Sequence, residues 1–198
     1  MIKQSASLRL FALLGGIITA ALLAVAVPTH VHADTTTQAT VSFSMADDAA
    51  VSISDMPNID FGTQQVTAQA QDVEAQSVSA PVTVTNPGFS NGWTLTVAAS
   101  DFSNSDNTRS IKGANMTFDQ AHVTAADSSN VSAAPTSTSA KVVAGGDAQP
   151  IITAAKNTGI GTYNTQYQTT QVHLRIPSGN VEAAYNADLN WSMTNSVQ

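Results

Sequence analysis

The stretch Val181–Met193, "VEAAYNADLNWSM", carries an apolar side chain at every odd position, with mostly polar side chains between them. Successive side chains of a strand point to opposite faces, so this alternation predicts a strand with one apolar face. A helix would leave Trp191 off the face shared by Tyr185, Leu189 and Met193. "QVHLRI" (171–176) and the turn residues "PSGN" (177–180) precede the stretch. The sequence therefore predicts a final hairpin, which we place at the centre of the fold.

Alternation between apolar and hydroxyl side chains continues through most of the chain, where Thr, Ser and Val are abundant. Residues of these types favour strands. Two strands flanking residues 86–92 would form a hairpin, since Asn-Pro-Gly and Asn-Gly favour turns. These patterns predict an all-β, single-domain antiparallel β-sandwich, with further strands at 40–45, 51–56, 58–62, 80–86, 93–98 and 111–118, the last interrupted by Gly113 at a bulge.

Residues 124–150 differ in composition from the segments around them. Ser, Ala, Thr and Gly dominate this stretch, and only Val142 and Val143 suggest a short strand. Such a composition is typical of a long loop. We expect a flexible connection outside the sandwich.

The first 33 residues have the three parts of an export signal. Lys3 and Arg9 precede an apolar run from Leu10 to Val27, and small residues around Ala33 fit a signal peptidase site. A retained transmembrane helix is the alternative interpretation, but Pro28 and the cleavage pattern favour removal of the segment. We expect a cleavable signal peptide at 1–33 and a mature domain at 34–198.

Charge and cysteine content exclude several classes of function. Once Lys3 and Arg9 leave with the signal, five basic side chains oppose fourteen acidic ones, which makes nucleic acid an unsuitable partner. The chain contains no cysteine, so disulfides, thiolate metal sites and a lipid-modified cysteine are excluded. After Trp191 only "SMTNSVQ" follows. We expect no permanent membrane anchor and no covalent attachment to the wall.

The two tryptophans stand in similar contexts, "WTLTV" and "LNWSM". Trp93 shares its predicted face with Leu95 and Val97, and Trp191 shares its face with Leu189 and Met193. Core packing of both rings is the favoured interpretation, and an exposed aromatic platform is the alternative. Tyr163 and Tyr167 lie four apart among Thr and Gln, so a strand would place them on one face. They are better candidates for ligand-facing aromatics than the tryptophans.

One motif suggests a catalytic serine and another suggests a calcium site, but neither has the surrounding sequence that such a site requires. Gly88–Gly92 matches Gly-x-Ser-x-Gly around Ser90, yet a strand pattern follows it where a hydrolase requires a helix. Asp101, Asn104, Asp106 and Asn107 supply oxygen ligands without an ordered calcium-loop pattern, and a solvated turn explains them better. We therefore expect no enzyme activity, no catalytic residues, no metal and no cofactor.

The paired segments "GWTLTV" and "YNADLNWSM" resemble the signature of the WxL domain of Gram-positive surface proteins. Its first motif corresponds to Trp93 and Leu95. Its second motif corresponds to Tyr185, Leu189, Trp191 and Met193, where Met193 replaces the usual leucine. "ISDMPNIDFG" and "IKGANMTF" also resemble family segments, so the resemblance spans nearly all of residues 38–195. Leu and Met are similar in volume and polarity, so the replacement conserves the motif.

The resemblance implies a secreted protein on the cell surface, bound noncovalently to the peptidoglycan of a Gram-positive cell wall. It also implies association with other surface proteins encoded at the same locus. Two rivals remain open. One is a structural subunit of a surface polymer built by strand pairing, and the other is a wall hydrolase that uses paired carboxylates.

Overall fold

The computed structural model describes residues 38–195, so the expected signal peptide at 1–33 lies outside the described residues. The chain falls into two units that divide between Ser42 and Phe43. Neither strand nor helix is assigned to Thr40–Met45, which corrects the strand expected there. The fold described below is that of the second unit, residues 43–195.

The second unit is an all-β fold of antiparallel sheets, as the alternating patterns predict. The first sheet has the order β1-β5-β12-β8. Val and Thr dominate β5, one of its two inner strands, which pairs with β1 on one side and with β12 on the other. Its strands are β1 (Ser52–Asp55), β5 (Val82–Asn86), β12 (Gly161–Thr165) and β8 (Val123–Ala125).

The second sheet has the order β10-β7-β13-β3. β13, one of its two inner strands, contains Val172, Leu174 and Ile176 on its inward side, as predicted. A single-turn 3₁₀ helix, η1 (Thr169–Gln171), leads into that strand. The strands of this sheet are β10 (Ala140–Val143), β7 (Asn115–Phe118), β13 (Val172–Ile176) and β3 (Gln71–Glu74).

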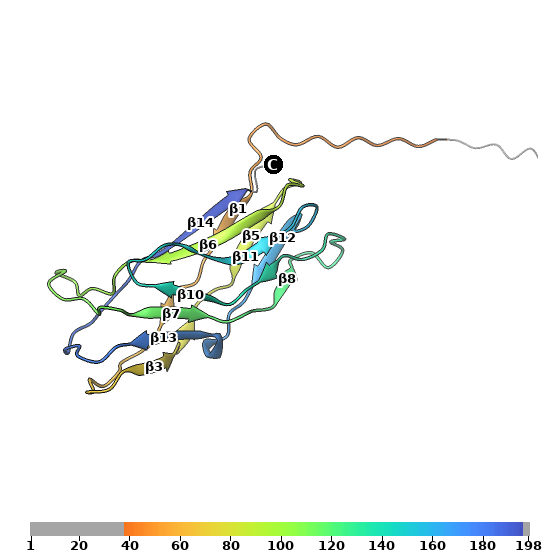
Figure 1. Cartoon of the computed structure of the whole chain (residues 1–198). Coiled ribbons are helices and arrows are strands. Elements are labelled where there is room, and N and C mark those ends of the chain that lie inside the picture. The colour runs from red at the N-terminus through yellow and green to blue at the C-terminus, as the bar shows by residue number, and fades with distance from the viewer. Residues whose placement is uncertain (1–37, 196–198) are drawn as a thin grey trace, which may run out of the picture. The chain divides into compact units, whose positions relative to one another are not determined.

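The third sheet has the order β14-β6-β11-β9 and contains both tryptophan segments (Figure 1). A bridge between Ala99 and Ala144 joins its strand β6 to the end of β10. A separate two-stranded ribbon pairs β2 (Ile59–Asp60) with β4 (Ser77–Val78). The strands of the third sheet are β14 (Leu189–Asn195), β6 (Trp93–Ala99), β11 (Gln149–Ala154) and β9 (Thr136–Ser137).

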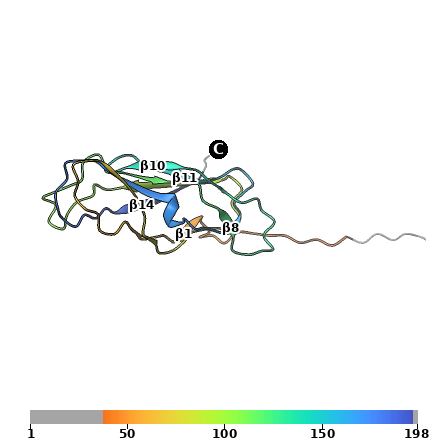
Figure 2. The same cartoon turned by 90° about the horizontal axis from the view of Figure 1, so that it is seen from below.

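The core lies between the layers of the sandwich. Seen from below, β10 and β11 lie in one layer and β1 and β8 lie in the other (Figure 2). Thr94 and Thr96 of β6 alternate with side chains that have no exposed surface. Burying large apolar groups in this way provides most of the driving force for folding. The side chains at 0% exposure include Trp93, Leu95, Val97, Phe118, Val142, Ile151 and Val172.

Both expected hairpins are wrong. Strands β5 and β6 flank residues 86–92 but belong to different sheets, and so do β13 and β14. The last strand begins at Leu189 instead of Val181, and it forms an edge of its sheet instead of the centre. Tyr185 donates a hydrogen bond from its hydroxyl to the carbonyl oxygen of Val181, 2.9 Å away. A fully extended chain could not make this contact, and the chain bends at residues 182–183, so the alternating stretch is not one continuous strand.

Residues 124–150 contain more secondary structure than their composition predicts. They hold β9 and β10 complete, with parts of β8 and β11. The central residues of β10, Lys141 and Val142, pair with Thr117 and Met116 of β7. The segment therefore contributes to all three large sheets, which corrects the expected connection outside the sandwich. Gly113, at φ +75°, lies in a turn before β7 and not at a bulge within a strand.

Candidate functional site

The two motif segments lie side by side, although almost a hundred residues separate them. β14 pairs with β6 in an unbroken antiparallel register along its whole length. Met193 is the Cα partner of Leu95, and Trp191 is the partner of Val97. Directly opposed residues project to the same face of a sheet. The motifs are therefore two halves of one apolar surface.

Trp93 is wholly buried and anchors a neighbouring turn. Its indole Nε1 donates a hydrogen bond to the carbonyl oxygen of Gly159 at 3.1 Å. Gly159 has φ +65°, and a Cβ there would stand 2.6 Å from Ala154 Cβ and 3.0 Å from Trp93 Nε1. Only glycine fits this position without displacing its neighbours. Trp93 is a core residue, and its ring has no surface to offer a ligand.

Trp191 is half-buried on the edge strand β14. Its ring meets Phe118 edge to face, with centroids 6.1 Å apart and planes at 75°. Phe118 in turn meets Tyr167 edge to face at 5.5 Å. Such pairs stabilise a fold beyond their buried area alone. Trp191 therefore connects the third sheet to Phe118 of the second sheet while keeping part of its surface open to solvent.

Tyr163 and Tyr167 are buried, at 2% and 1% exposure, which corrects their expected place on a ligand-facing surface. The Tyr163 hydroxyl donates to the carbonyl oxygen of Ser132 at 2.9 Å. The Tyr167 hydroxyl shares a hydrogen bond of 3.3 Å with Ser137 Oγ. Burial raises the pKa of Tyr167 to about 12, although the Ser137 contact opposes the shift. Both hydroxyls bond within the fold.

A groove of about 960 Å³ opens between the chain segments 59–71 and 177–189. Its floor consists of core side chains from β7, β13 and the loop between β6 and β7, namely Phe102, Ile111, Met116 and Leu174. Half-buried Phe61 and Tyr185 line its walls. Its rim carries many amides, including Gln64, Gln65, Gln69, Gln71, Asn180 and Asn186. We call this feature the amide groove.

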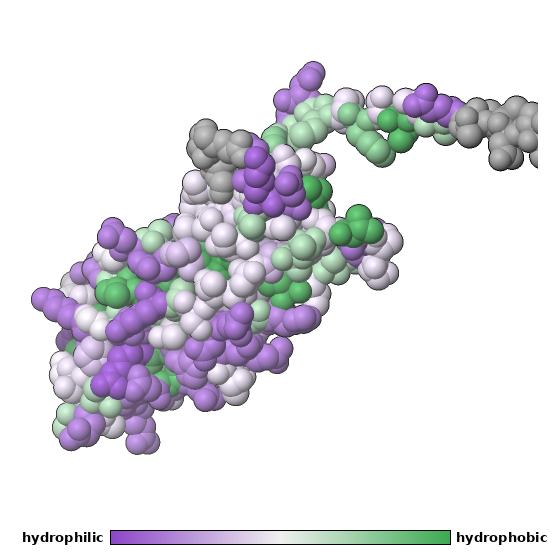
Figure 3. Space-filling view, turned by 45° about the vertical axis from the view of Figure 1, so that its right-hand side comes forward, coloured by the Kyte–Doolittle hydropathy of each residue, from purple (hydrophilic) through white to green (hydrophobic). Residues whose placement is uncertain are grey.

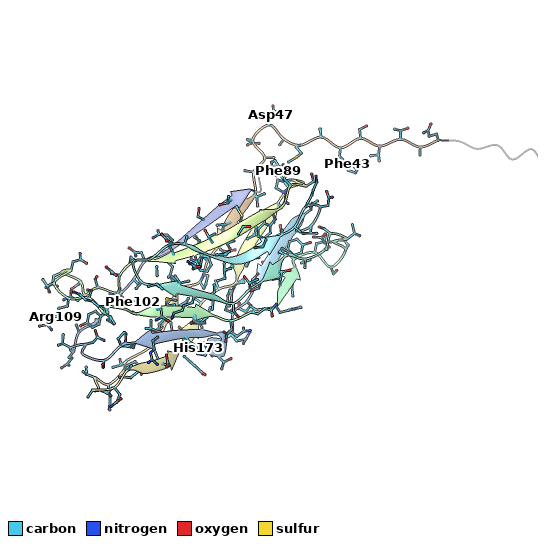
Figure 4. All side chains as sticks on the ribbon, in the orientation of Figure 1. Phe43, Asp47, Phe89, Phe102, Arg109 and His173 are labelled. Atoms are coloured by element: carbon cyan, nitrogen blue, oxygen red, sulfur yellow. The ribbon has the colours of Figure 1, made fainter. Side chains whose placement is uncertain are left out.

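The loops at one end of the amide groove are held by backbone contacts. Ser103 and Asn186 form a two-way bridge, with each amide nitrogen 2.9 Å from the other's carbonyl oxygen. Arg109 Nη1 also donates to the carbonyl oxygen of Glu182 at 3.4 Å. Phe102 and Arg109 mark this end of the fold in Figure 4. The motif residues Tyr185 and Leu189 thus reach the groove, whereas Trp93 does not.

Sequence reasoning did not identify the amide groove. The one sequence feature that could have indicated it is the glutamine-rich run "GTQQVTAQAQ" (62–71), because its amides have no role in a core. Two segments far apart in sequence form the walls, so alternation alone could not bring them together.

Apolar and hydrophilic side chains are interspersed on the face shown in Figure 3.

The two motifs that lacked chemical context lie in loops. Ser90 follows a turn held by Asn86, and a strand follows the motif as expected. Asp106 accepts hydrogen bonds from the Thr108 hydroxyl at 2.8 Å and from its amide at 3.2 Å. These contacts hold the pKa of Asp106 below its ordinary value. Within residues 38–195, no group of three or more acidic or histidine side chains is placed to hold a metal ion.

Comparison with known families identifies the chain over nearly its whole length. The family model described as "WxL domain surface cell wall-binding" matches residues 28–196. The chain therefore belongs to the WxL family and is a cell-surface protein that attaches to the cell wall. Comparison with curated proteins and with solved structures finds no match. In the part of the chain that the structure describes, no helix has the length and hydropathy to cross a membrane.

Proposed function

We propose that the protein attaches noncovalently to peptidoglycan and that the amide groove holds a segment of its glycan strand. The observation that carries this proposal is the set of side chains that line the groove of this chain, which belongs to a wall-binding family. Its volume of about 960 Å³ is that of a ligand site. Amide side chains both donate and accept hydrogen bonds, as sugar hydroxyl and acetamido groups require. The half-buried rings of Phe61 and Tyr185 offer apolar surface to a sugar ring.

The charge of the groove favours a glycan over a phosphate-rich wall polymer. Asp60 and Glu182 are the only ionisable lining residues apart from Tyr185, and no lysine, arginine or histidine contributes to the lining. A polyphosphate ligand would require basic partners. A cavity that does contain basic groups lies elsewhere, on the outer face of the second sheet. There Arg175 pairs with Asp72, and His173 lies 3.3 Å from Asp119.

The experiment measures binding of the exported protein to purified cell walls stripped of teichoic acid. The double variant Gln65→Ala/Gln69→Ala removes two exposed rim amides without touching the core. Loss of two hydrogen bonds should weaken binding by roughly tenfold or more and leave the melting temperature unchanged. Asn91→Ala/Gln120→Ala removes two exposed amides outside the groove and serves as the control. Equal binding of both double variants would contradict the proposal.

Three further parts of this proposal rest on the family and on the sequence. We propose that residues 1–33 are removed on export, which the mass of the secreted protein tests. We also propose that surface proteins encoded nearby bind this domain, which co-purification from the producing cell tests. The absence of enzyme activity is the third part. Release of soluble muropeptides from purified walls would overturn it, including for a hydrolase with paired carboxylates.

A further inference from the structure

The edge strand β14 is open to a further strand. It pairs with β6 on one side, and no strand pairs with its other side among residues 43–195. Its seven residues, "LNWSMTN", include neither a charge nor a proline, and their register with β6 contains no bulge. Edge strands usually carry charges, prolines or bulges because these features prevent pairing with another chain.

The other sheet edges are better protected. β1 has a register shift and ends at Asp55, β3 carries Asp72 and Glu74, and β10 carries Lys141. The edge strands β8 and β9 have only three and two residues. β14 is therefore the longest edge and lacks each of these protections.

The apolar layer of the third sheet is incomplete at β14. Leu95 and Val97 of β6 are fully buried, whereas Met193 and Trp191 opposite them are only half-buried. Leu189 is also half-buried. An additional strand beside β14 would cover these three side chains with its own inward face. The edge thus offers both backbone hydrogen-bonding groups and apolar surface.

The same chain carries a segment with the properties of such a strand. Thr40–Met45, "TVSFSM", alternates hydroxyl and apolar side chains and has no charge. Its apolar side chains are exposed, with Val41 at 75%, Phe43 at 93% and Met45 at 43%. Figure 4 labels Phe43 on an extended stretch of chain. Exposed large apolar side chains in a strand-like pattern are unusual for a surface that binds nothing.

We propose that Thr40–Met45 of one copy pairs with the β14 edge of a second copy. Val41, Phe43 and Met45 then lie on the face of Leu189, Trp191 and Met193 and complete the apolar layer. Six extended residues span about 20 Å, which is close to the length of β14. Backbone hydrogen bonds provide affinity, and the alternating side chains fix the register, as in other cases of strand addition.

A second copy suits this edge because every chain carries one donor segment and one acceptor edge. Two copies can exchange segments reciprocally, which closes a dimer, or donation can continue from copy to copy. Such an assembly would be the strand-paired surface polymer that was the structural rival to a binding module. This inference does not rest on wall attachment, since the amide groove and the β14 edge are tested with different variants.

The first experiment measures the molar mass of the exported protein by light scattering over a range of concentrations. We expect assembly that grows with concentration. Phe43→Asp on the donor and Asn190→Lys on the acceptor should each raise the dissociation constant by roughly tenfold or more. Neither change alters a buried residue, so the melting temperature of the domain should stay the same. Val131→Asp changes a fully exposed valine elsewhere and should leave assembly unchanged.

The second experiment uses the absence of cysteine from the chain. Ser42→Cys in one preparation is mixed and oxidised with Asn190→Cys, Ser192→Cys or Thr194→Cys in another. Neighbouring cross-strand positions are close enough for a disulfide, so at least one mixture should form a heterodimer. Three outcomes overturn the proposal: a monomer at every concentration, assembly unaffected by Phe43→Asp, and cross-linking within single chains of the double variant Ser42→Cys/Ser192→Cys.

Discussion

Leu95 and Met193 are direct partners across β6 and β14, and they join the two family motifs into one apolar surface. Leu95 is fully buried, and Met193 covers the same face from the edge strand. Their opposition explains why the motifs occur as a pair: each strand supplies half of a surface that neither could form alone. Since methionine fills irregular space easily, it can replace leucine at the half-exposed position.

A double-mutant cycle should detect this pairing. Leu95→Ala removes a wholly buried side chain and should cost about 3 kcal/mol in the free energy of unfolding. Met193→Ala should cost less because its side chain is half-exposed. In combination, the two losses should deviate from additivity by roughly 0.5 kcal/mol or more, as expected for side chains in contact. Urea unfolding measures all three variants. The pair Leu95→Ala and Val131→Ala should be additive, and so serves as the control.

The two tryptophans should differ in their contributions to stability. Trp93→Ala leaves a cavity and an unbonded Gly159 carbonyl, so we expect a loss of about 4 kcal/mol. Trp191→Ala removes a half-buried ring and one aromatic contact with Phe118, and we expect a loss of about 2 kcal/mol. Denaturant unfolding checks both values. Loss of wall binding by Trp191→Ala at an unchanged melting temperature would assign Trp191 to the ligand instead.

The alternation of apolar and polar residues predicted the fold class and the approximate positions of β1, β2, β5, β6 and β13, but not which strands pair. The turn chemistry at 86–92 is real, since Asn86 Oδ1 accepts hydrogen bonds from the amides of Gly88 and Phe89. That turn directs the chain into another sheet instead of reversing it within one. The local sequence determines the turn, whereas pairing with strands far away in the sequence determines which sheet the next strand joins.

The candidate site was predicted in part, for a related reason. Alternation placed Trp93 and Trp191 on apolar faces, and the structure buries Trp93 fully and Trp191 partly. Tyr163 and Tyr167 stand among polar neighbours, so nothing in the sequence indicated that both faces of this region would be covered. β12 lies inside the first sheet, and residues 132–137 supply partners for both tyrosine hydroxyls. Polar residues that bond to buried hydroxyls resemble surface residues in a sequence.

The buried hydroxyl of Tyr167 should make stability decrease at alkaline pH. Its folded pKa of about 12 lies above the ordinary tyrosine value of 10.0, so the unfolded chain loses this proton first. The stabilising contribution is complete below pH 10 and is lost as pH rises toward 12. Two pKa units correspond to at most about 3 kcal/mol. The free energy of unfolding of Tyr167→Phe should decrease less between pH 9.5 and 11.5 than that of the wild type. Parallel pH profiles would contradict this assignment.

Long-range charge should make wall binding stronger at acidic pH. Fourteen carboxylates in the chain face a wall that is itself anionic, so repulsion opposes attachment at neutral pH and low salt. Carboxylates lose charge as pH falls toward about 4, and imidazoles ordinarily become cationic below about 6.5. Asp106 and Asp127 should lose their charge last, because hydrogen bonds from Thr108 and Ser129 lower their pKa values. Repulsion therefore decreases continuously with acidification.

We accordingly expect tighter binding to stripped walls at pH 5 than at pH 7.5, and a smaller difference in high salt because ions screen the same repulsion. Sedimentation of the exported protein with walls measures both effects. The amide-groove variant Gln65→Ala/Gln69→Ala should bind more weakly at both pH values yet keep the same dependence on pH. Equal binding at both pH values in low salt, or a difference that grows with added salt, would show that short-range contacts alone control attachment.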